Sequence, residues 1–192
     1  RIGAEAAFDR GFCIEMDERR AALEMTRHLI DLGHTRIAFV TGPVAYGASR
    51  RRLAGYRDAM AEAGLEVAPA WVVEGDFTFN SGSLAMEKLH QTAPDITAIF
   101  ASNDDMAAAT VAVAHRRGLD VPGDLSIVGF DDTTIASHIW PPLTTVRWPI
   151  ASMAHSAALK LVSADEGTSA REPSMFLSTL IRRASASPPK NG

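Results

Sequence analysis

The sequence predicts an α/β fold in which a parallel β-sheet carries helices on both faces. From residue 36 onward, short apolar runs of strand-like composition alternate with longer segments of helical periodicity, in the order β-α-β-α-β-α-β. Only a few residues separate one segment from the next. Such alternation is typical of a parallel sheet with right-handed crossovers. With 192 residues and 46% hydrophobic content, the chain can bury a substantial core in one or two compact domains.

The first elements are marked by apolar periodicity and by glycine. Residues 11–16 favour a short strand. Asp17 then precedes a helical pattern that Gly33 ends, in line with the capping preferences of helices. The next elements are expected in this order: a strand at residues 37–40, a helix from about 48 to 63, a strand at 71–73, and a helix that opens at Asn80 or Ser81 and runs through Leu89.

The second half of the chain is organised around residues 124–149. Residues 125–128 form an apolar, β-branched run typical of a buried parallel strand, and Asp131 and Asp132 follow closely after it. The pair Pro141-Pro142 predicts a rigid hinge, after which residues 143–148 favour a strand that leaves the first sheet. The remaining elements are a strand at 96–101, a helix from Asn103 or Asp104 to Arg117-Gly118, a helix from about 150 to 164, a strand within 175–181, and a Ser/Pro-rich tail from Ser185 that we expect to fray.

The loops that follow the strands should gather at one edge of the sheet, because parallel strands all end on the same side. These loops are residues 42–52, 76–80, 102–105 and 130–134. They carry Arg52, Phe77, Asn103, Asp104 and Asp131. Hydrogen-bonding groups around an aromatic face suit a polar organic ligand. Two alternatives stay open: Arg52 as a solvated surface charge, and Asn103 and Asp131 as caps of the segments that follow them.

Charge and composition argue against several classes of function. The net charge of −4 disfavours a nucleic-acid surface within this chain, because phosphate binding depends on clustered Lys and Arg. The single cysteine, Cys13, excludes an internal disulfide and favours a reduced, cytosolic setting. No apolar run approaches the roughly 18 residues of a membrane span. The chain starts at Arg1 and not at Met, so we expect the natural N-terminus to lie further upstream.

The sequence contains no pattern that supports catalysis. Residues 42–47 have the glycine spacing of a phosphate-binding loop, but Ala48 stands where that loop needs its lysine. The six histidines lack zinc-site spacing, and the G-x-S-x-G pattern of hydrolases does not occur. Asp131 and Asp132 are neighbours and should point in different directions, which suits an acid/base pair poorly. We therefore expect no enzymatic activity, no metal and no cofactor.

Six stretches of the sequence carry specific local patterns. They are HLIDLGHTRIAFVTGP (residues 28–43), RLAGYRDAMAEAGL (52–65), GDFTFNSG (75–82), SNDDMA (102–107), GLDVPGDLSIVGFDD (118–132) and PPLTTVRWP (141–149). Together they closely resemble the effector-binding domain of LacI/GalR-type bacterial transcriptional regulators. The resemblance spans residues 15–187 in the right order and spacing.

This resemblance implies a periplasmic-binding-protein-like fold of type I, with two α/β lobes and an effector in the cleft between them. The parallel-sheet lobe would comprise residues 34–147 and 167–192. Residues 1–33 and 148–166 would form part of a second, N-terminal lobe. The helix-turn-helix with which such regulators read DNA has no counterpart in this chain.

The resemblance also implies which residues contact the effector. Arg52 matches the arginine that usually holds a polar effector group, Asp131 the acidic residue after the last central strand, and Asn103 the first residue of the family's N-D-x-M-A motif. Phe77 falls where an aromatic ring commonly stacks on the ligand. This set suits the recognition of hydroxyl groups, and a sugar or sugar derivative is the expected effector.

Two further positions depart from the patterns of many relatives. Trp148 stands where many of them have glutamine, and Tyr46 stands where purine-responsive members carry polar contacts, which argues against a purine corepressor. We expect both residues to line the ligand site, with core or interface packing as the alternative for Trp148.

The function implied is that of an effector sensor in a cytoplasmic regulator, in which lobe closure changes operator affinity. Its partners would be a sugar-like effector, operator DNA through the missing N-terminal domain, and a second copy of the chain, with Ala108 and Ile139 near the twofold axis. No membrane is involved. A sugar-binding protein of a transport system is the main alternative, because it shares the fold, and an enzyme is a weaker one.

Overall fold

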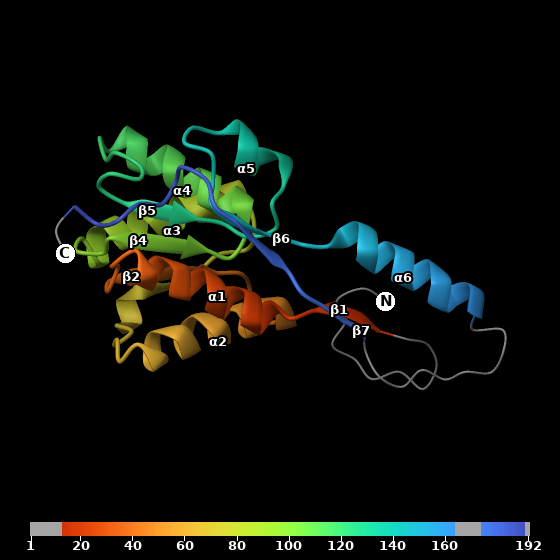
Figure 1. The fold of residues 1–192 in the computed structure, drawn as a ribbon. Helices are drawn as coiled ribbons and strands as arrows, with labels where there is room; N and C mark the ends of the chain where they lie inside the picture. The colour runs from red at the N-terminus through yellow and green to blue at the C-terminus, as the bar shows by residue number, and fades with distance from the viewer. Residues whose placement is uncertain (1–12, 164–173, 191–192) are drawn as a thin grey trace. The chain divides into compact units, whose positions relative to one another are not determined.

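The computed structural model describes residues 13–163 and 174–190 (Figure 1). By its contacts the chain divides into two compact units. The larger unit comprises residues 18–147 and 180–192, and the smaller unit comprises residues 1–17 and 148–179.

A four-stranded parallel sheet forms the centre of the larger unit. Its strands are β2 (Ile37–Thr41), β3 (Val72–Glu74), β4 (Ala98–Ala101) and β5 (Ser126–Val128). They lie in the order β3-β2-β4-β5, and all three pairings are parallel. Strand β2 lies inside the sheet, and all of its residues are buried. The predicted parallel α/β sheet is therefore confirmed.

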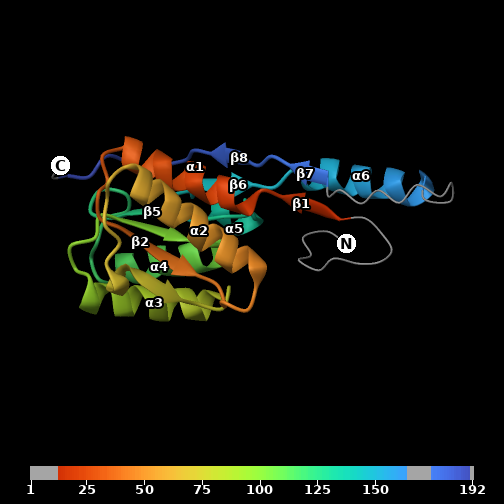
Figure 2. The same cartoon turned by 90° about the horizontal axis from the view of Figure 1, so that it is seen from below.

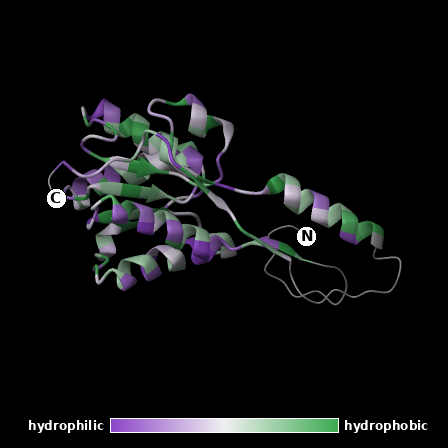
Figure 3. Cartoon of the chain, viewed as in Figure 1, coloured by the Kyte–Doolittle hydropathy of each residue, from purple (hydrophilic) through white to green (hydrophobic). Residues whose placement is uncertain are grey.

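Helices cover both faces of this sheet (Figure 2). Helix α1 (Glu18–Asp31) packs against α2 (Gly47–Glu62), and α3 (Phe79–Thr92) packs against α4 (Asp104–Arg116). Side chains of β2 alternate between the faces: Ala38 and Val40 join the core cluster formed with α3 and α4, whereas Phe39 stacks on Tyr56 of α2. The hydrophobic colouring of the strands in Figure 3 reflects this coverage on both sides.

Polar caps and glycines set the ends of the helices. The side chain of Thr78 accepts a hydrogen bond from the amide of Ser81 at the start of α3, so this helix begins just before the predicted Asn80 or Ser81. After α1, α2 and α4 the chain turns through Gly33, Gly64 and Gly118, whose φ angles are 101°, 68° and 78°. Glycine adopts this left-handed conformation without a steric penalty, which explains why the helices end there.

A short helix, α5 (Thr134–His138), and a further strand, β6 (Thr145–Arg147), follow β5. Earlier in the chain, a 3₁₀ turn, η1 (Pro69–Trp71), precedes β3. Parallel bridges join Val128 to Thr144 and Asp131 to Arg147, and β6 pairs with β8 (Thr179–Ile181). A second β-segment after the proline pair was predicted, and the structure confirms it.

The segment from Ser185 to residue 190 packs on the larger unit, so the expectation that it frays was wrong. Ser185 is fully buried, its hydroxyl donates to the carbonyl oxygen of Ile127 at 2.5 Å, and it accepts from the amide of Thr144 at 2.9 Å. His34 Nε2 donates to the carbonyl oxygen of Ser187 at 2.9 Å. Burial lowers the pKa of His34, although the hydrogen bond to Ser187 opposes the shift. The serine hydroxyls that suggested a solvated tail are hydrogen-bonded inside the unit.

The described residues of the smaller unit, 13–17, 148–163 and 174–179, form a two-stranded parallel pair and one helix. Strand β1 (Ile14–Met16) pairs with β7 (Ser174–Phe176), and α6 (Ile150–Ser163) contacts β1. Ile14 and Met16 are buried. None of the helices in the described ranges is long and apolar enough to cross a membrane.

The division into units differs from the lobe boundaries expected from the sequence. Residues 18–33 were expected in the N-terminal lobe with residues 1–17, but α1 belongs to the larger unit because it packs along α2. Gly55 makes this close approach feasible, since a Cβ atom there would collide with the carbonyl oxygen of Arg19. In the other direction, residues 174–179 group with the smaller unit and not with the parallel-sheet lobe, and residues 167–173 lie outside the described residues.

Candidate functional site

Arg52 is the centre of a polar cluster at the carboxyl ends of the strands of the larger unit. It comes from α2, yet only 4% of its surface is exposed. Its Nη1 donates to the carbonyl oxygen of Ser102, directly after β4, and its Nη2 donates to Oδ1 of Asp131, after β5, at 3.3 Å. The structure therefore brings Arg52 and Asp131 together as predicted, and the alternative of a solvated Arg52 is wrong.

A buried carboxylate that the sequence did not single out completes this cluster. Arg52 Nε donates to Oε2 of Glu18 at 2.5 Å, and the Glu18 side chain is 3% exposed. Glu18 is the first residue of α1, where an acidic side chain is favoured by the helix dipole alone. No local signal separates such a residue from an ion-pair partner 34 positions away, which is why the sequence alone did not reveal it.

Aromatic rings form the floor under the Arg52 guanidinium. Its Cζ atom lies 3.8 Å from the centroid of the Phe130 ring, within cation–π range. Phe130 stacks on Phe100, which meets Phe39 edge-on. The guanidinium thus packs on the Phe130 ring, and its hydrogen bonds to Glu18 and Asp131 fix its orientation.

Asn103 combines a capping role with support for the neighbouring loop. Its Oδ1 accepts from the amide of Met106 at 3.0 Å and caps α4, so the capping alternative is correct. Its Nδ2 donates to the carbonyl oxygen of Phe77 at 2.9 Å. Asn103 therefore lies at the predicted edge, but protein groups already engage both ends of its amide.

Phe77 and Tyr46 lie next to each other on the loops after β3 and β2. Their ring centroids are 6.2 Å apart. The ring of Phe77 covers Gly42, where any Cβ atom would collide with it. Phe77 is half-buried, whereas Tyr46 is 59% exposed. The two rings offer a partly exposed apolar surface beside the polar cluster.

Backbone strain concentrates at the same edge. Among the described residues, the non-glycine residues with positive φ are Phe77, Asp131 and Asp132, at 69°, 107° and 54°. All three follow strands of the central sheet. Such conformations are costly for residues with a Cβ atom and persist where the surroundings hold them in place, most often at functional sites. The strain is therefore an independent reason to treat this edge as the candidate functional site.

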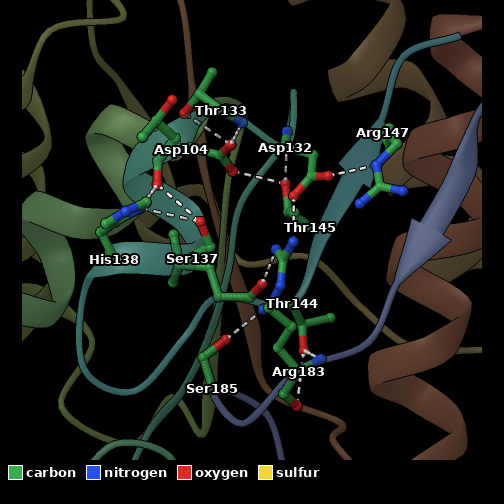
Figure 4. Close-up of polar contacts among 12 residues, drawn as sticks. Asp104, Asp132, Thr133, Ser137, His138, Thr144, Thr145, Arg147, Arg183 and Ser185 are labelled. Atoms are coloured by element: carbon green, nitrogen blue, oxygen red, sulfur yellow. Dashed lines mark hydrogen bonds and ion pairs between the residues drawn. The ribbon is translucent and has the colours of Figure 1, made fainter.

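A second polar network includes Asp104 and Asp132, the residue that follows Asp131 (Figure 4). The fully buried Asp104 accepts from the amide of Thr133 at 2.7 Å and from the hydroxyl of Thr145 at 2.6 Å. Burial raises the pKa of Asp104, although these hydrogen bonds oppose the shift. The network ties the start of α4 to the loop after β5 and to β6.

Asp132 belongs to this second network and not to the Arg52 cluster. It accepts from Arg147 Nε at 2.5 Å and from Arg183 Nη2 at 2.6 Å (Figure 4). Burial alone would raise the pKa of Asp132, but the hydrogen bonds from Arg183 and Arg147 outweigh it and lower that pKa. Asp131 and Asp132 thus serve different partners, in line with the argument that they make a poor acid/base pair.

Three further observations complete the description of the site. Trp148 is half-buried and belongs to the smaller unit, so its place beside the other predicted residues stays a prediction. In the larger unit the hydroxyls of Ser49 and Ser102 are buried and have no hydrogen-bond partner among the described residues. Within those residues, no group of three His, Cys, Asp or Glu side chains could hold a metal ion.

Comparisons with known proteins give a consistent result. Residues 26–186 match the sequence profile of the periplasmic binding protein-like domain. The chain is 40% identical over 178 residues to the HTH-type transcriptional regulator GalR of Escherichia coli K12, covering 92% of this chain and 52% of that protein. It is 45% identical over 126 residues to the ribose operon repressor of the same strain, covering 65% of this chain and 38% of that protein.

The solved structures agree with the sequence comparisons. The fold matches that of a transcriptional regulator CelR-cellobiose complex with a TM-score of 0.87 and 38% identity, covering 91% of this chain and 54% of that one. The expected periplasmic-binding-protein-like fold is therefore confirmed. The chain spans about half the length of the curated relatives it matches.

Proposed function

Because this chain belongs to the periplasmic binding protein-like domain family and its relatives are LacI/GalR-family transcriptional regulators, not enzymes, we propose that it senses a small polar effector for such a regulator. The observation that carries this proposal is the placement of Arg52. A buried arginine whose donors converge on strand ends, above an aromatic floor and next to a half-buried ring, is a preorganised recognition group.

The effector class that fits best is a sugar or sugar derivative. Arg52 donates and Asp131 accepts charge-assisted hydrogen bonds that orient the hydroxyl groups, while Phe77 and Tyr46 cover the apolar face of a pyranose ring. The CelR relative was solved as a complex with cellobiose, and another relative is a ribose operon repressor.

Signalling would follow from a shift between two lobe arrangements. An effector that prefers one arrangement moves a pre-existing equilibrium, and the altered spacing of two DNA-binding heads changes operator affinity. This scheme requires a homodimer and a helix-turn-helix outside residues 1–192. A sugar-binding protein of a transport system shares the fold and would bind without any DNA response, so a DNA readout separates the two.

A thermal-shift screen of neutral sugars on the full chain tests the proposal. At least one sugar should raise Tm in the wild type, and Asp131→Asn should weaken its binding at least about tenfold, because it removes a charged acceptor. Arg27→Ala, which removes an exposed arginine, is the control and should bind normally. If no sugar stabilises the wild type, or if Asp131→Asn binds as the wild type does, the proposed site is incorrect.

A further inference from the structure

Glu18 and Arg52 form a buried ion pair between α1 and α2. The Nε–Oε2 distance is 2.5 Å, and the two side chains are 3% and 5% exposed. Two further ion pairs between α1 and α2, Arg19–Asp58 and Arg27–Glu62, are much more exposed. Glu18 therefore differs from its neighbours on α1, because its charge is largely removed from water and directed at the arginine of the proposed site.

This pair sets the charge that a ligand would meet. An arginine that recognises an anion must offer an uncompensated positive charge, but here a fixed internal carboxylate already neutralises it. Asp131 brings a second carboxylate to Nη2 at 3.3 Å. What remains for a ligand is hydrogen-bonding capacity without a net attraction for negative charge.

The ion pairs around this turn balance in number, because three guanidinium groups face three carboxylates: Arg52, Arg147 and Arg183 face Glu18, Asp131 and Asp132. Arg147 and Arg183 are both bonded to Asp132. Asp104 is an acidic residue whose hydrogen bonds come from Thr133 and Thr145, so it adds no positive charge. The further buried polar groups near Arg52 are neutral: the hydroxyl of Ser49, one helical turn before it, and that of Ser102, whose carbonyl it binds.

We infer that Glu18 is a specificity-determining residue that makes the site select neutral, hydroxyl-bearing ligands and reject anionic ligands of the same shape, such as sugar phosphates and uronic acids. The inference rests on the proposed function and narrows its ligand class. Like charges placed close together in a poorly hydrated site disfavour binding strongly, so discrimination should reach at least about tenfold.

The test uses the full chain and two matched pairs of probes. Galactose is compared with galacturonate, and glucose with glucose 6-phosphate; inorganic phosphate serves as a ligand-independent anion probe. In the wild type, the neutral member of a pair that binds should bind at least about tenfold more tightly than its anionic partner. Glu18→Gln, which keeps the shape but removes the charge, should gain at least about tenfold in affinity for phosphate and for the anionic sugars.

Two control variants separate Glu18 from general effects of charge. Glu62→Gln changes the net charge equally at an exposed position and should bind phosphate as the wild type does. Glu18→Asp keeps the carboxylate and should also show no gain. Equal phosphate affinity in Glu18→Gln and wild type, or a wild type that binds an anionic sugar as tightly as its neutral partner, overturns the inference.

The effect of phosphate on Tm also tests the inference if Glu18→Gln folds poorly. Glu18→Gln leaves a buried guanidinium without its carboxylate and should be less stable. Phosphate should then raise the Tm of Glu18→Gln more than that of Glu62→Gln, and recover folded protein if the variant is unfolded without it. An equal response of both variants overturns the inference. A wild type that binds no neutral sugar contradicts the proposed function, and the phosphate measurements still decide the role of Glu18.

Discussion

Asp131 and Asp132 are consecutive aspartates in the same strained turn, yet their surroundings give them opposite properties. Asp132 is clamped by Arg147 and Arg183, and its side chain is 7% exposed. The Asp131 side chain is 31% exposed and faces the guanidinium of Arg52. One aspartate therefore holds the turn in place, and the other is presented by it. The two residues are of the same type, so their different roles follow from the different partners that the fold places beside them.

The largest loss of stability is expected at Asp104, the fully buried carboxylate of the second polar network. Asp104→Ala leaves the amide of Thr133 and the hydroxyl of Thr145 without their acceptor, so the free energy of unfolding should fall by about 2–4 kcal/mol. Urea denaturation measures this loss. Asp105→Ala, at the exposed neighbouring position, is the matched control and should change stability by less than about 0.5 kcal/mol. Similar losses in both variants would show that the network contributes little.

The comparison of the two aspartates becomes sharper when each is removed separately. Asp132→Ala should lower the free energy of unfolding by about 1–2 kcal/mol, because the partly buried Arg183 loses its carboxylate. Asp131→Ala should cost less than about 1 kcal/mol but weaken effector binding. Denaturation and ligand titration on both variants check this division of roles. The reverse pattern would assign the clamp to Asp131.

The pH dependence of stability should distinguish Asp104 from Asp132 by sign. The raised pKa of Asp104 means that its favourable contribution is complete below the unfolded value near 3.9 and is lost as pH rises through the folded value. The lowered pKa of Asp132 has the opposite consequence: its contribution is present above about 3.9 and is lost as pH falls through the folded value.

Asparagine variants test both signs by denaturation at a series of pH values. As pH rises from the acidic range to neutrality, wild type should lose stability relative to Asp104→Asn and gain stability relative to Asp132→Asn. A common sign for the two differences would mean that the burial of Asp104 does not dominate its titration.

Much of this architecture could be predicted from the sequence because it depends on local patterns. Apolar runs predict β2 and β5, and Gly33 and Gly64 predict the ends of the helices before them. The convergence of Arg52 and Asp131 follows from parallel strands ending at one edge. These inferences need only periodicity, capping and topology.

The rest could not be predicted because it depends on partners distant in sequence. Glu18 pairs with a residue 34 positions away, and the hydroxyl of Ser185 reaches Ile127, 58 positions away. The placement of α1 in the larger unit depends on a close helix–helix contact at Gly55, which no single segment encodes. The Ser/Pro-rich sequence from Ser185 onward predicted a solvent-exposed tail, although Ser185 is fully buried.

The smallest loss of stability is expected at an exposed ion pair between the same two helices. Arg27 and Glu62 join the same two helices as Arg52 and Glu18, with an Nη2–Oε2 distance of 2.6 Å, but their side chains are 53% and 49% exposed. Water and salt screen such a pair, so Glu62→Gln should lower the free energy of unfolding by only about 0.2–1 kcal/mol, and less at high ionic strength. Glu18→Gln should cost more than this and respond weakly to salt, because burial prevents screening. Denaturation of both variants at low and high sodium chloride measures the contrast, and equal, salt-sensitive losses would place Glu18 in contact with solvent.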